Sequence, residues 1–352
     1  MGPRVSHVAN AIAMLVLLAG AAAPAVAQRV EGRVVSASDS VGIATALVQL
    51  LDGAGARVAQ VSAAAGGTFR LSAPTPGRYV VAVLRIGQRA WRSAPLDLDA
   101  GAVRRVILSV PDDPITLPAI TVEAPSACRT SPAEGSLIGA LLAEADKALT
   151  VTRLAMESGA AGYLVERYER MQTERFATVD SVGMIEGNTA WPIRSAPPES
   201  LAIHGWVRED ATDTDGRLGR TIYFGPDASV LFSPWFLSTH CFGVSGGVGA
   251  DTDAVAVTFR PVGGRRADIA GRLIIAHRTL ELRRIEWRYV RLGWWVTLEG
   301  AGGAMDLERL PSGAYLPSQW WMRGPVAEVN ARHEPVKHWG WKERGGRLVP
   351  SP

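Results

Sequence analysis

Short stretches of alternating apolar and polar residues, separated by turn residues, dominate residues 28–110. The pairs Asp52-Gly53, Gly66-Gly67 and Pro76-Gly77 fall between these stretches, and such pairs favour tight turns. Short strands at roughly 8–12-residue spacing, with turns between them, predict a β-sandwich. The strands are expected over residues 29–36, 44–51, 57–63, 68–71, 78–85 and 104–110.

Four motifs in this region carry a resemblance to a known family. They are Gly32-x-Val34, Ala46-x-Val48-x-Leu50, Gly67-x-Phe69-x-Leu71 and Pro76-Gly77-x-Tyr79-x-Val81. Together they resemble the carboxypeptidase regulatory-like domain, which has a transthyretin-like fold, over residues 28–110. Glycine suits these positions because its backbone adopts positive φ angles without strain. In that family the module is a non-catalytic accessory, so the resemblance implies binding or spacing rather than chemistry.

A proline-rich segment follows the sandwich. Residues 111–130 include Pro111, Pro114, Pro118 and Pro125, and this density of proline predicts an extended linker.

A helix is expected at the start of the second domain, at residue 131. Ser131, Pro132 and Glu134 fit an N-cap, a proline in the first turn and a capping box. The helix is expected to end near Ser158, because Gly159 follows. Residues 163–182 fit either a helix or a long strand. The apolar stripe of the helix is expected at Leu137, Leu141, Leu142, Ala145, Ala148 and Leu149.

Alternation typical of antiparallel strands returns from His204 onward. Ile285, Trp287 and Tyr289 alternate with charged residues, and hairpins are expected over residues 271–290 and 306–322. One helix followed by an antiparallel sheet is similar in pattern to the half-barrel of periplasmic lipoprotein-sorting (LolA/LolB-like) proteins, over roughly residues 130–325. Residues 326–352 are expected to form a polar and aromatic tail.

The first 27 residues have the features of a secretory signal peptide. Arg4 precedes an apolar run over residues 11–19, and Ala25-Val26-Ala27 gives the small-x-small pattern of a cleavage site before Gln28. The apolar run is shorter than the roughly 20 residues that a membrane-spanning helix needs. With an Ala-, Gly- and Arg-rich composition, this predicts a bacterial protein that is secreted across the inner membrane to the periplasm or cell surface.

The chain contains two cysteines, Cys128 and Cys241. In an oxidising compartment, an even number of cysteines predicts a disulfide bond between them. Two free thiols are the alternative.

Gly243-Val-Ser245-Gly-Gly247 formally fits the G-x-S-x-G motif of serine hydrolases. That motif requires a strand before the serine and a helix after it, whereas a strand is expected to follow here. A glycine-rich loop is therefore favoured. A hydrolase that uses Ser245, with His240 and Asp251 as partners, or another His-based site, is the alternative.

Two further patterns suggest metal ligands. His333 and His338 are five positions apart, rather than four, and Pro335 would interrupt the helix that a zinc motif needs. The segment 210–216 is rich in Asp, but it lacks the final Glu of a calcium-binding loop and is expected to be a surface turn. The sequence predicts neither a metal nor a cofactor.

Two tryptophan pairs are the candidate ligand-binding residues: Trp294-Trp295 and Trp320-Trp321. Neighbours on a strand point to opposite faces, so each pair should place one ring in the core and one outside. An outer ring caps the rim of a sheet, lines an apolar groove for an acyl chain, or stacks on a sugar.

The sequence therefore predicts a mainly β protein with an N-terminal sandwich and an α+β second domain. The latter has one long helix and an antiparallel sheet or half-barrel. The 37 basic and 34 acidic residues are spread along the chain, which argues against a nucleic-acid partner. The predicted function is that of a non-catalytic cell-envelope binding or adapter protein with an apolar groove. The partner is an envelope lipid, a glycan or an outer-membrane protein, and a carbohydrate-binding accessory module is a further alternative.

Overall fold

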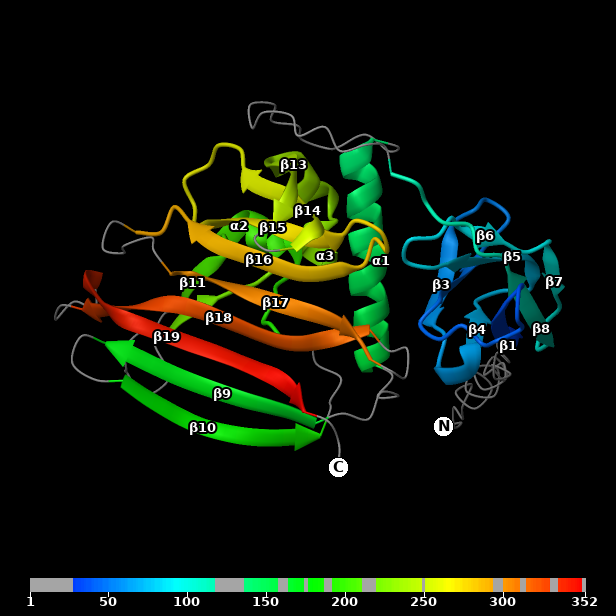
Figure 1. Cartoon of the computed structure of the whole chain (residues 1–352), viewed down its shortest axis with the longest axis horizontal. Helices are drawn as coiled ribbons and strands as arrows, with labels where there is room; N and C mark the ends of the chain where they lie inside the picture. Colours follow the sequence, from blue (N-terminus) through cyan, green and yellow to red (C-terminus); the bar gives the residue numbers. More distant parts are fainter. Residues whose placement is uncertain are drawn as a thin grey trace, which may run out of the picture.

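The structure, a computed structural model, contains two mainly β domains with a long helix between them (Figure 1). It describes residues 28–117, 136–157, 164–173, 177–186, 192–210, 220–248, 251–293, 300–310, 315–329 and 335–349.

The N-terminal domain is a sandwich of two sheets. One sheet has the order β4-β1-β8, and the other has the order β3-β2-β5-β6 with β7 paired to β5. Strand β1 is antiparallel to β4 and parallel to β8. The predicted sandwich is confirmed, although the short strands β6 and β7 were not expected. The elements are β1 (Gln28–Ser36), β2 (Leu47–Leu51), β3 (Arg57–Ser62), a 3-10 turn (Ala65–Gly67), β4 (Thr68–Ala73), β5 (Gly77–Leu84), β6 (Trp91–Arg92), β7 (Leu96–Leu98) and β8 (Val103–Val110).

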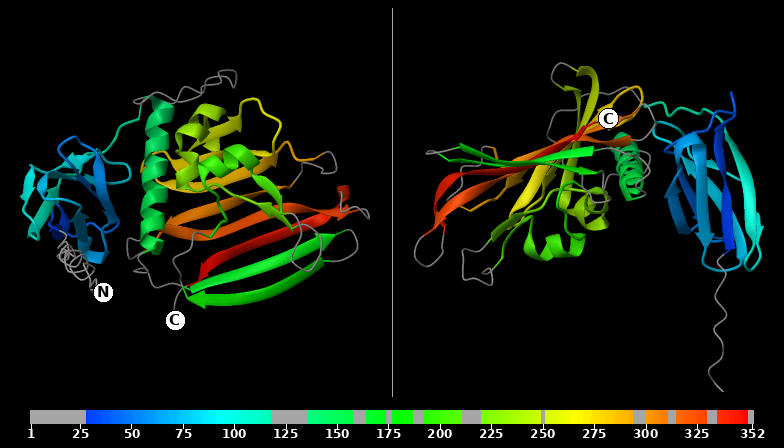
Figure 2. Two further views of the ribbon diagram at one scale, coloured as in Figure 1. Left: turned by 180° about the vertical axis from the view of Figure 1, so that it is seen from behind. Right: turned by 90° about the horizontal axis from the view of Figure 1, so that it is seen from below.

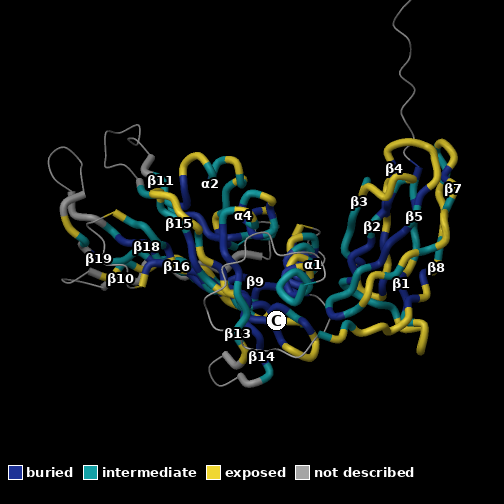
Figure 3. The backbone as a smooth tube through the Cα atoms, turned by 90° about the horizontal axis from the view of Figure 1, so that it is seen from above, coloured by how far each residue is buried: buried dark blue, intermediate teal, exposed yellow. Residues whose placement is uncertain are grey.

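Alternate residues of these strands fill the space between the two sheets. Tyr79, Val81 and Val83 are buried on one face of β5, as their alternation predicted. Gly66 and Gly67 have φ angles of 71° and 79°, so the turn before β4 needs the backbone freedom of glycine. Figure 3 shows the buried positions between the sheets of the sandwich and between the second sheet and its helices.

The second domain is built on one antiparallel sheet of nine strands. Their order is β10-β9-β19-β18-β17-β16-β15-β14-β13, and β11 and β12 form a separate hairpin. The elements are α1 (Leu137–Glu157), β9 (Leu164–Thr173), β10 (Ala177–Glu186), α2 (Pro198–His204), β11 (Val207–Asp210), β12 (Arg220–Tyr223), α3 (Ala228–Leu231), α4 (Pro234–Thr239), β13 (His240–Val248), β14 (Asp251–Pro261), β15 (Asp268–Ala276), β16 (Leu282–Val290), β17 (Gly302–Arg309), β18 (Tyr315–Val329) and β19 (Pro335–Val349).

Three expectations for this domain need correction or resolution. Helix α1 starts at Leu137 rather than near Ser131, because the hydroxyl of Ser136 accepts the backbone N–H of Gly139 at 3.1 Å and so caps the first turn. The ambiguous segment 163–182 contains all of strand β9 and the first part of strand β10. Residues 335–349, expected in a tail, form β19, which pairs with both β18 and β9 inside the sheet.

Helices and the β11–β12 hairpin cover one face of the nine-stranded sheet, as the view from behind shows (Figure 2). The expected stripe of α1 is buried there: Leu141, Ala145 and Leu149 have no exposed surface. They share a core with Val257, Ile285 and other inward residues of the strands. The opposite face carries charged side chains and is called the open face below. No described helix combines the length and the apolar character that a membrane crossing requires.

The loop between β5 and β6 joins the two domains. The backbone N–H of Gly87 donates to Glu144 of α1 at 2.8 Å, and Lys147 donates to the backbone carbonyls of Arg85 and Gln88 at 3.3 Å each. Glu144 is 2% exposed and forms an ion pair with Lys147 at 2.5 Å. A buried carboxylate is stable only when donors satisfy it, and this loop supplies one of them.

Close packing reinforces this contact. Gly87 has a φ of +74°, and a Cβ atom there would lie 2.5 Å from the carbonyl oxygen of Thr279 in the β15–β16 turn. Leu47 belongs to the hydrophobic core of the second domain, and Ile86 packs against it. The sandwich is therefore docked on the second domain rather than merely tethered to it.

Candidate functional site

Ser245 does not lie at a nucleophile elbow. It is in the middle of β13 and pairs with Ala256 of β14 in an antiparallel hairpin. The required turn into a helix is absent from residues 240–248, so the elbow reading of this motif is wrong. His240 and Asp251 lie near opposite ends of the same hairpin, so they do not form a catalytic pair with each other.

His240 has a structural environment. Its ring is fully buried and stacks on Phe236 with 3.7 Å between ring centroids. Its Nδ1 atom lies 3.2 Å from the carbonyl oxygen of Phe236, and its Nε2 atom lies 3.3 Å from Asp268. These contacts hold the start of β13 against α4.

The two sequence patterns that suggested metal ligands lie only partly within the described residues. His338 lies on β19, while His333 is outside the described residues, and so are residues 211–219 of the Asp-rich segment. The described residues contain no group of three or more potential ligands that is suited to hold a metal ion.

The predicted disulfide bond involves Cys241, which is 4% exposed on β13. No described cysteine is a free thiol. Cys128 lies outside the described residues, so its pairing with Cys241 stays a prediction.

Trp320 and Trp321 point to opposite faces of β18, as expected. Trp320 is 7% exposed and belongs to the core beneath the helices, so it is the inward ring of the pair, and its role as a ligand-binding residue stays a prediction. Trp321 is half-buried on the open face, where the guanidinium of Arg323 lies 5.4 Å from its ring centroid. Trp294 and Trp295 are outside the described residues.

A carboxylate cluster beside Trp321 was not anticipated from the sequence. Glu343 of β19 is 3% exposed and accepts a hydrogen bond from Tyr168 at 2.9 Å. It also contacts Arg170 at 2.5 Å and Arg323 at 2.6 Å. Burial, together with the hydrogen bond to Glu343, raises the pKa of Tyr168 to about 12. With these three partners, Glu343 links β19 to its two neighbouring strands, β9 and β18, so we assign the cluster a structural role.

Further ion pairs cross the open face. Glu286 of β16 lies 2.6 Å from both Arg272 of β15 and Arg284 of β16, and Arg284 also contacts Asp306 of β17 at 2.5 Å. Although burial alone would raise the pKa of Glu286, the hydrogen bonds from the two arginines lower it. Charge on this part of the open face is therefore largely neutralised within the protein.

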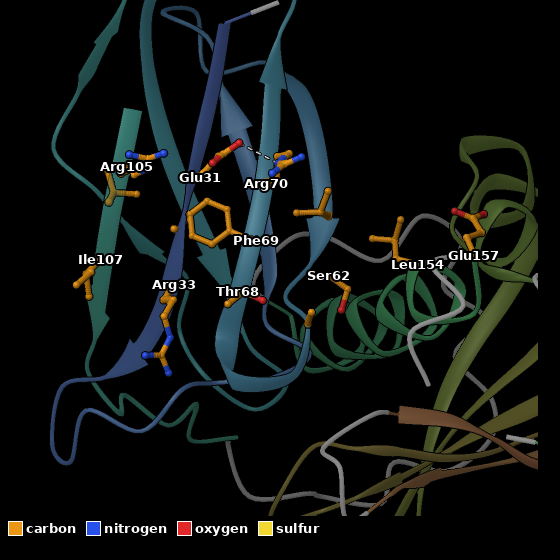
Figure 4. Close-up of a pocket in the computed structure, with 14 residues that line it drawn as sticks. Glu31, Arg33, Ser62, Thr68, Phe69, Arg70, Arg105, Ile107, Leu154 and Glu157 are labelled. Carbon is orange, nitrogen blue, oxygen red and sulfur yellow. Dashed lines mark ion pairs between the residues drawn. The ribbon is translucent and has the colours of Figure 1, made fainter. Parts of the chain in front are cut away.

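The N-terminal sandwich presents a different surface, a groove of about 820 Å³ (Figure 4). It runs over the outer face of the β4-β1-β8 sheet and reaches Leu154 and Glu157 near the end of α1. We call it the arginine groove. Its lining residues are Glu31, Gly32, Arg33, Val61, Ser62, Ala64, Thr68, Phe69, Arg70, Arg105, Val106, Ile107, Leu154 and Glu157.

Strand register places the charged residues of the groove side by side. Glu31 is aligned with Arg70 on one side and Arg105 on the other, and Arg33 is aligned with Ile107 in the next row. Arg70 forms an ion pair with Glu31 at 2.9 Å. Arg33 donates its Nε–H to the carbonyl oxygen of Gly66 at 3.0 Å.

Arg105 has no side-chain partner among the described residues and is exposed. Its neighbour in the groove, Ile107, is 75% exposed, which is a high value for a large aliphatic side chain. The groove thus combines unneutralised positive charge with accessible apolar surface, a composition that suits a binding site.

The comparisons agree with the fold of this domain. Residues 29–111 match the family model of the carboxypeptidase regulatory-like domain, so the resemblance of the N-terminal sandwich is confirmed. No curated protein matches the chain. The similarity of the second domain to lipoprotein-sorting half-barrels stays a prediction.

Several solved structures match the chain at low similarity. A minor pilin of Streptococcus agalactiae is 12% identical, with a TM-score of 0.20, over 28% of this chain and 48% of the pilin chain, about half its length. A DUF1329 family protein of Desulfovibrio piger is 9% identical, with a TM-score of 0.24, over 58% and 92% of the two chains. A putative membrane-associated protein of Bacteroides fragilis is 10% identical, with a TM-score of 0.19, over 92% and 98%. These scores are too low for an inference about function.

Proposed function

We propose that this chain is a non-catalytic binding or adapter protein of the bacterial cell envelope, which binds an envelope component in the arginine groove. The observation that carries this proposal is the groove itself, where Arg33, Arg70 and Arg105 face one another across three strands beside exposed Ile107. The export of the protein to the periplasm or cell surface, inferred from residues 1–27, is part of the proposal.

Two features support a binding role. The family of the N-terminal sandwich supplies accessory modules rather than catalytic ones. The groove also includes Leu154 and Glu157 of α1, so both domains contribute to it. Because Glu144 and Lys147 fix the sandwich against the same helix, the two sides of the groove are held in a set arrangement.

The alternatives have less support. A hydrolase built on Ser245 lacks the strand–turn–helix context of its nucleophile. A carbohydrate-binding module that uses the described tryptophan pair of β18 has only Trp321 of that pair at the surface, because Trp320 is part of the core.

A photoreactive amino acid tests the proposal without assuming a ligand. It is placed at position 107 in the groove and, as a matched control, at position 203, where Ile203 of α2 is 59% exposed. Cells that express each variant are irradiated, and the intact mass of the purified protein is measured. We expect a covalent adduct of defined mass at position 107 and none at position 203.

The opposite pattern, an adduct at position 203 without one at position 107, would show that the binding surface lies elsewhere. Absence of an adduct at both positions would also contradict the proposal, provided that both variants are exported and folded.

A further inference from the structure

We propose that the arginine groove binds the phosphate head group and part of an acyl chain of an anionic phospholipid. This inference rests on the proposed function, and it names the chemistry of the ligand. Figure 4 shows Arg33 and Arg105 with Ile107 over the sheet, and Leu154 with Glu157 toward α1, so the groove offers both cationic and apolar contacts, as an amphiphile requires.

Arg33 and Arg105 form the head-group site. They lie on adjacent strands one row apart, because Arg33 is aligned with Ile107 and Glu31 is aligned with Arg105. Neighbouring strands are about 4.8 Å apart and successive rows are roughly 7 Å apart, so two guanidinium groups on long side chains can meet at one phosphate. Arginine binds phosphate with pairs of parallel hydrogen bonds.

The donors needed for this contact are available. Arg33 uses its Nε–H for the carbonyl oxygen of Gly66, which leaves its terminal nitrogens for a ligand. Arg105 has no side-chain partner among the described residues. Arg70, by contrast, is paired with Glu31, so it contributes less to the binding of a phosphate. The groove therefore has an excess of positive charge at Arg33 and Arg105.

The groove also offers apolar surface. Ile107 stands exposed beside the arginines, and the partly buried Val61 and Leu154 line the groove toward α1, together with Ser62 and Glu157. Free phosphate or a glycan would leave this surface in contact with water. Burial of apolar surface by an acyl chain is favourable, at about 25 cal/mol per Å² removed from water. A volume of about 820 Å³ is large enough for a head group and part of one chain, but not for a whole diacyl lipid.

Calorimetric titration with short-chain lipids below their micelle concentrations tests this inference. The probes are dihexanoyl phosphatidylglycerol, dihexanoyl phosphatidylcholine with the same chains, and glycerol phosphate without chains. They are titrated into the chain purified from a bacterial periplasm after delipidation. We expect phosphatidylglycerol to bind at least about tenfold more tightly than either other probe, since only it has both an accessible anionic phosphate and chains.

Two neighbouring arginines give matched variants. R105E reverses a charge inside the groove, whereas R104E makes the same change at the adjacent exposed residue of β8, which does not line the groove. We expect R105E to weaken phosphatidylglycerol binding by at least about tenfold and R104E to change it by less than about twofold. Circular dichroism of each variant establishes that the fold is retained.

Three outcomes would overturn the inference. Equal binding of phosphatidylcholine would remove the role of the anionic head group, and equal binding of glycerol phosphate would remove that of the chain. If no lipid binds while the photoreactive residue at position 107 still gains an adduct, the ligand is of another class and the proposed function stands. If no lipid binds and no adduct forms at position 107, the groove is not a binding site and both proposals are wrong.

Discussion

Two sheet faces of this protein carry many arginines, but they differ in how many of these arginines form ion pairs with carboxylates. On the open face of the second domain, Arg170, Arg272, Arg284, Arg323 and Arg347 each contact a carboxylate. On the outer face of the β4-β1-β8 sheet, Arg29, Arg33, Arg70 and Arg105 lie with one carboxylate, Glu31, which forms an ion pair with Arg70.

The difference indicates where an external anion would be stabilised. Arginines that are already paired gain little from a ligand, because a ligand must replace a contact that exists. Arginines without partners gain a charge-assisted hydrogen bond at no such cost. Arg260 and Arg288 show that pairing on the open face is not complete, since neither has a side-chain partner among the described residues. They are isolated there, whereas Arg33 and Arg105 occupy one groove.

The largest expected effect is on stability and compares a paired arginine with one that lacks a side-chain partner in the part of the chain that the structure describes. Arg323→Ala removes two contacts of Glu343, which is 3% exposed, and should lower the free energy of unfolding by about 2 kcal/mol. Arg105→Ala should change it by less than about 0.5 kcal/mol. Urea unfolding followed by tryptophan fluorescence measures both. Equal shifts for the two variants would contradict the distinction between the faces.

The next prediction separates the two domains. Gly87→Ala places a Cβ atom 2.5 Å from the Thr279 carbonyl oxygen at a φ of +74°, so it should weaken docking by about 1–2 kcal/mol. Limited proteolysis should then cut the 111–130 segment faster than in the original chain. Gly53→Ala is the control, because the added methyl group there meets nothing within 4 Å. Unchanged proteolysis of Gly87→Ala would show that the loop contact does not hold the sandwich in place.

A smaller effect concerns the pH dependence of the open face. The pKa of Tyr168 is raised from 10.0 to about 12 in the folded protein, so folding favours its neutral form. This contribution to stability is complete below pH 10 and is lost as the pH rises from 10 toward 12. Tyr168→Phe should therefore flatten the alkaline fall in stability over that interval, as measured by urea midpoints at several pH values. An identical fall in the variant would assign it to other groups.

The smallest effect is expected at Ile107. Because this side chain is 75% exposed, Ile107→Ser should change the free energy of unfolding by less than about 0.5 kcal/mol. The same variant should bind dihexanoyl phosphatidylglycerol several-fold more weakly, because part of the chain contact is lost. A variant that loses stability but keeps its affinity would place Ile107 in the fold rather than in the binding site.

The sequence predicted the sandwich well because its strands are local and alternate cleanly. Tyr79, Val81 and Val83 were assigned to the core from their spacing, and all are buried. Strands β6 and β7 could not be predicted, because they have two and three residues, too few to show an alternation of apolar and polar side chains. The start of α1 was placed five residues early, since Ser131 and Ser136 both offer a capping hydroxyl.

Strand β19 was not predicted because its identity depends on distant pairing. Pro335, Gly340 and Gly345-Gly346 give the segment the composition of a loop, yet it pairs with β9, about 175 positions earlier. The ring of Tyr168 lies where a side chain on Gly345 would be, within 2.5 Å of the Cβ position. The glycine therefore provides space rather than a turn, which no local pattern indicates.

The sequence contains one signal for the arginine groove. Arg29, Glu31 and Arg33 alternate with buried residues of β1, so they share the outer face. Their alignment with Arg70 and Arg105 depends on strand order, in particular on the parallel pairing of β1 with β8. The composition of one strand is readable from the sequence, but the groove formed by three strands is not.

Native mass spectrometry of the chain purified from a bacterial periplasm tests the central comparison most directly. The original chain is measured beside R105E, in the arginine groove, and R288E, which makes the same change at an exposed arginine of β16 that has no side-chain partner among the described residues. We predict a bound adduct of lipid mass on the original chain and on R288E, and its loss from R105E. An adduct that persists on R105E and disappears from R288E would contradict this account and assign binding to the open face.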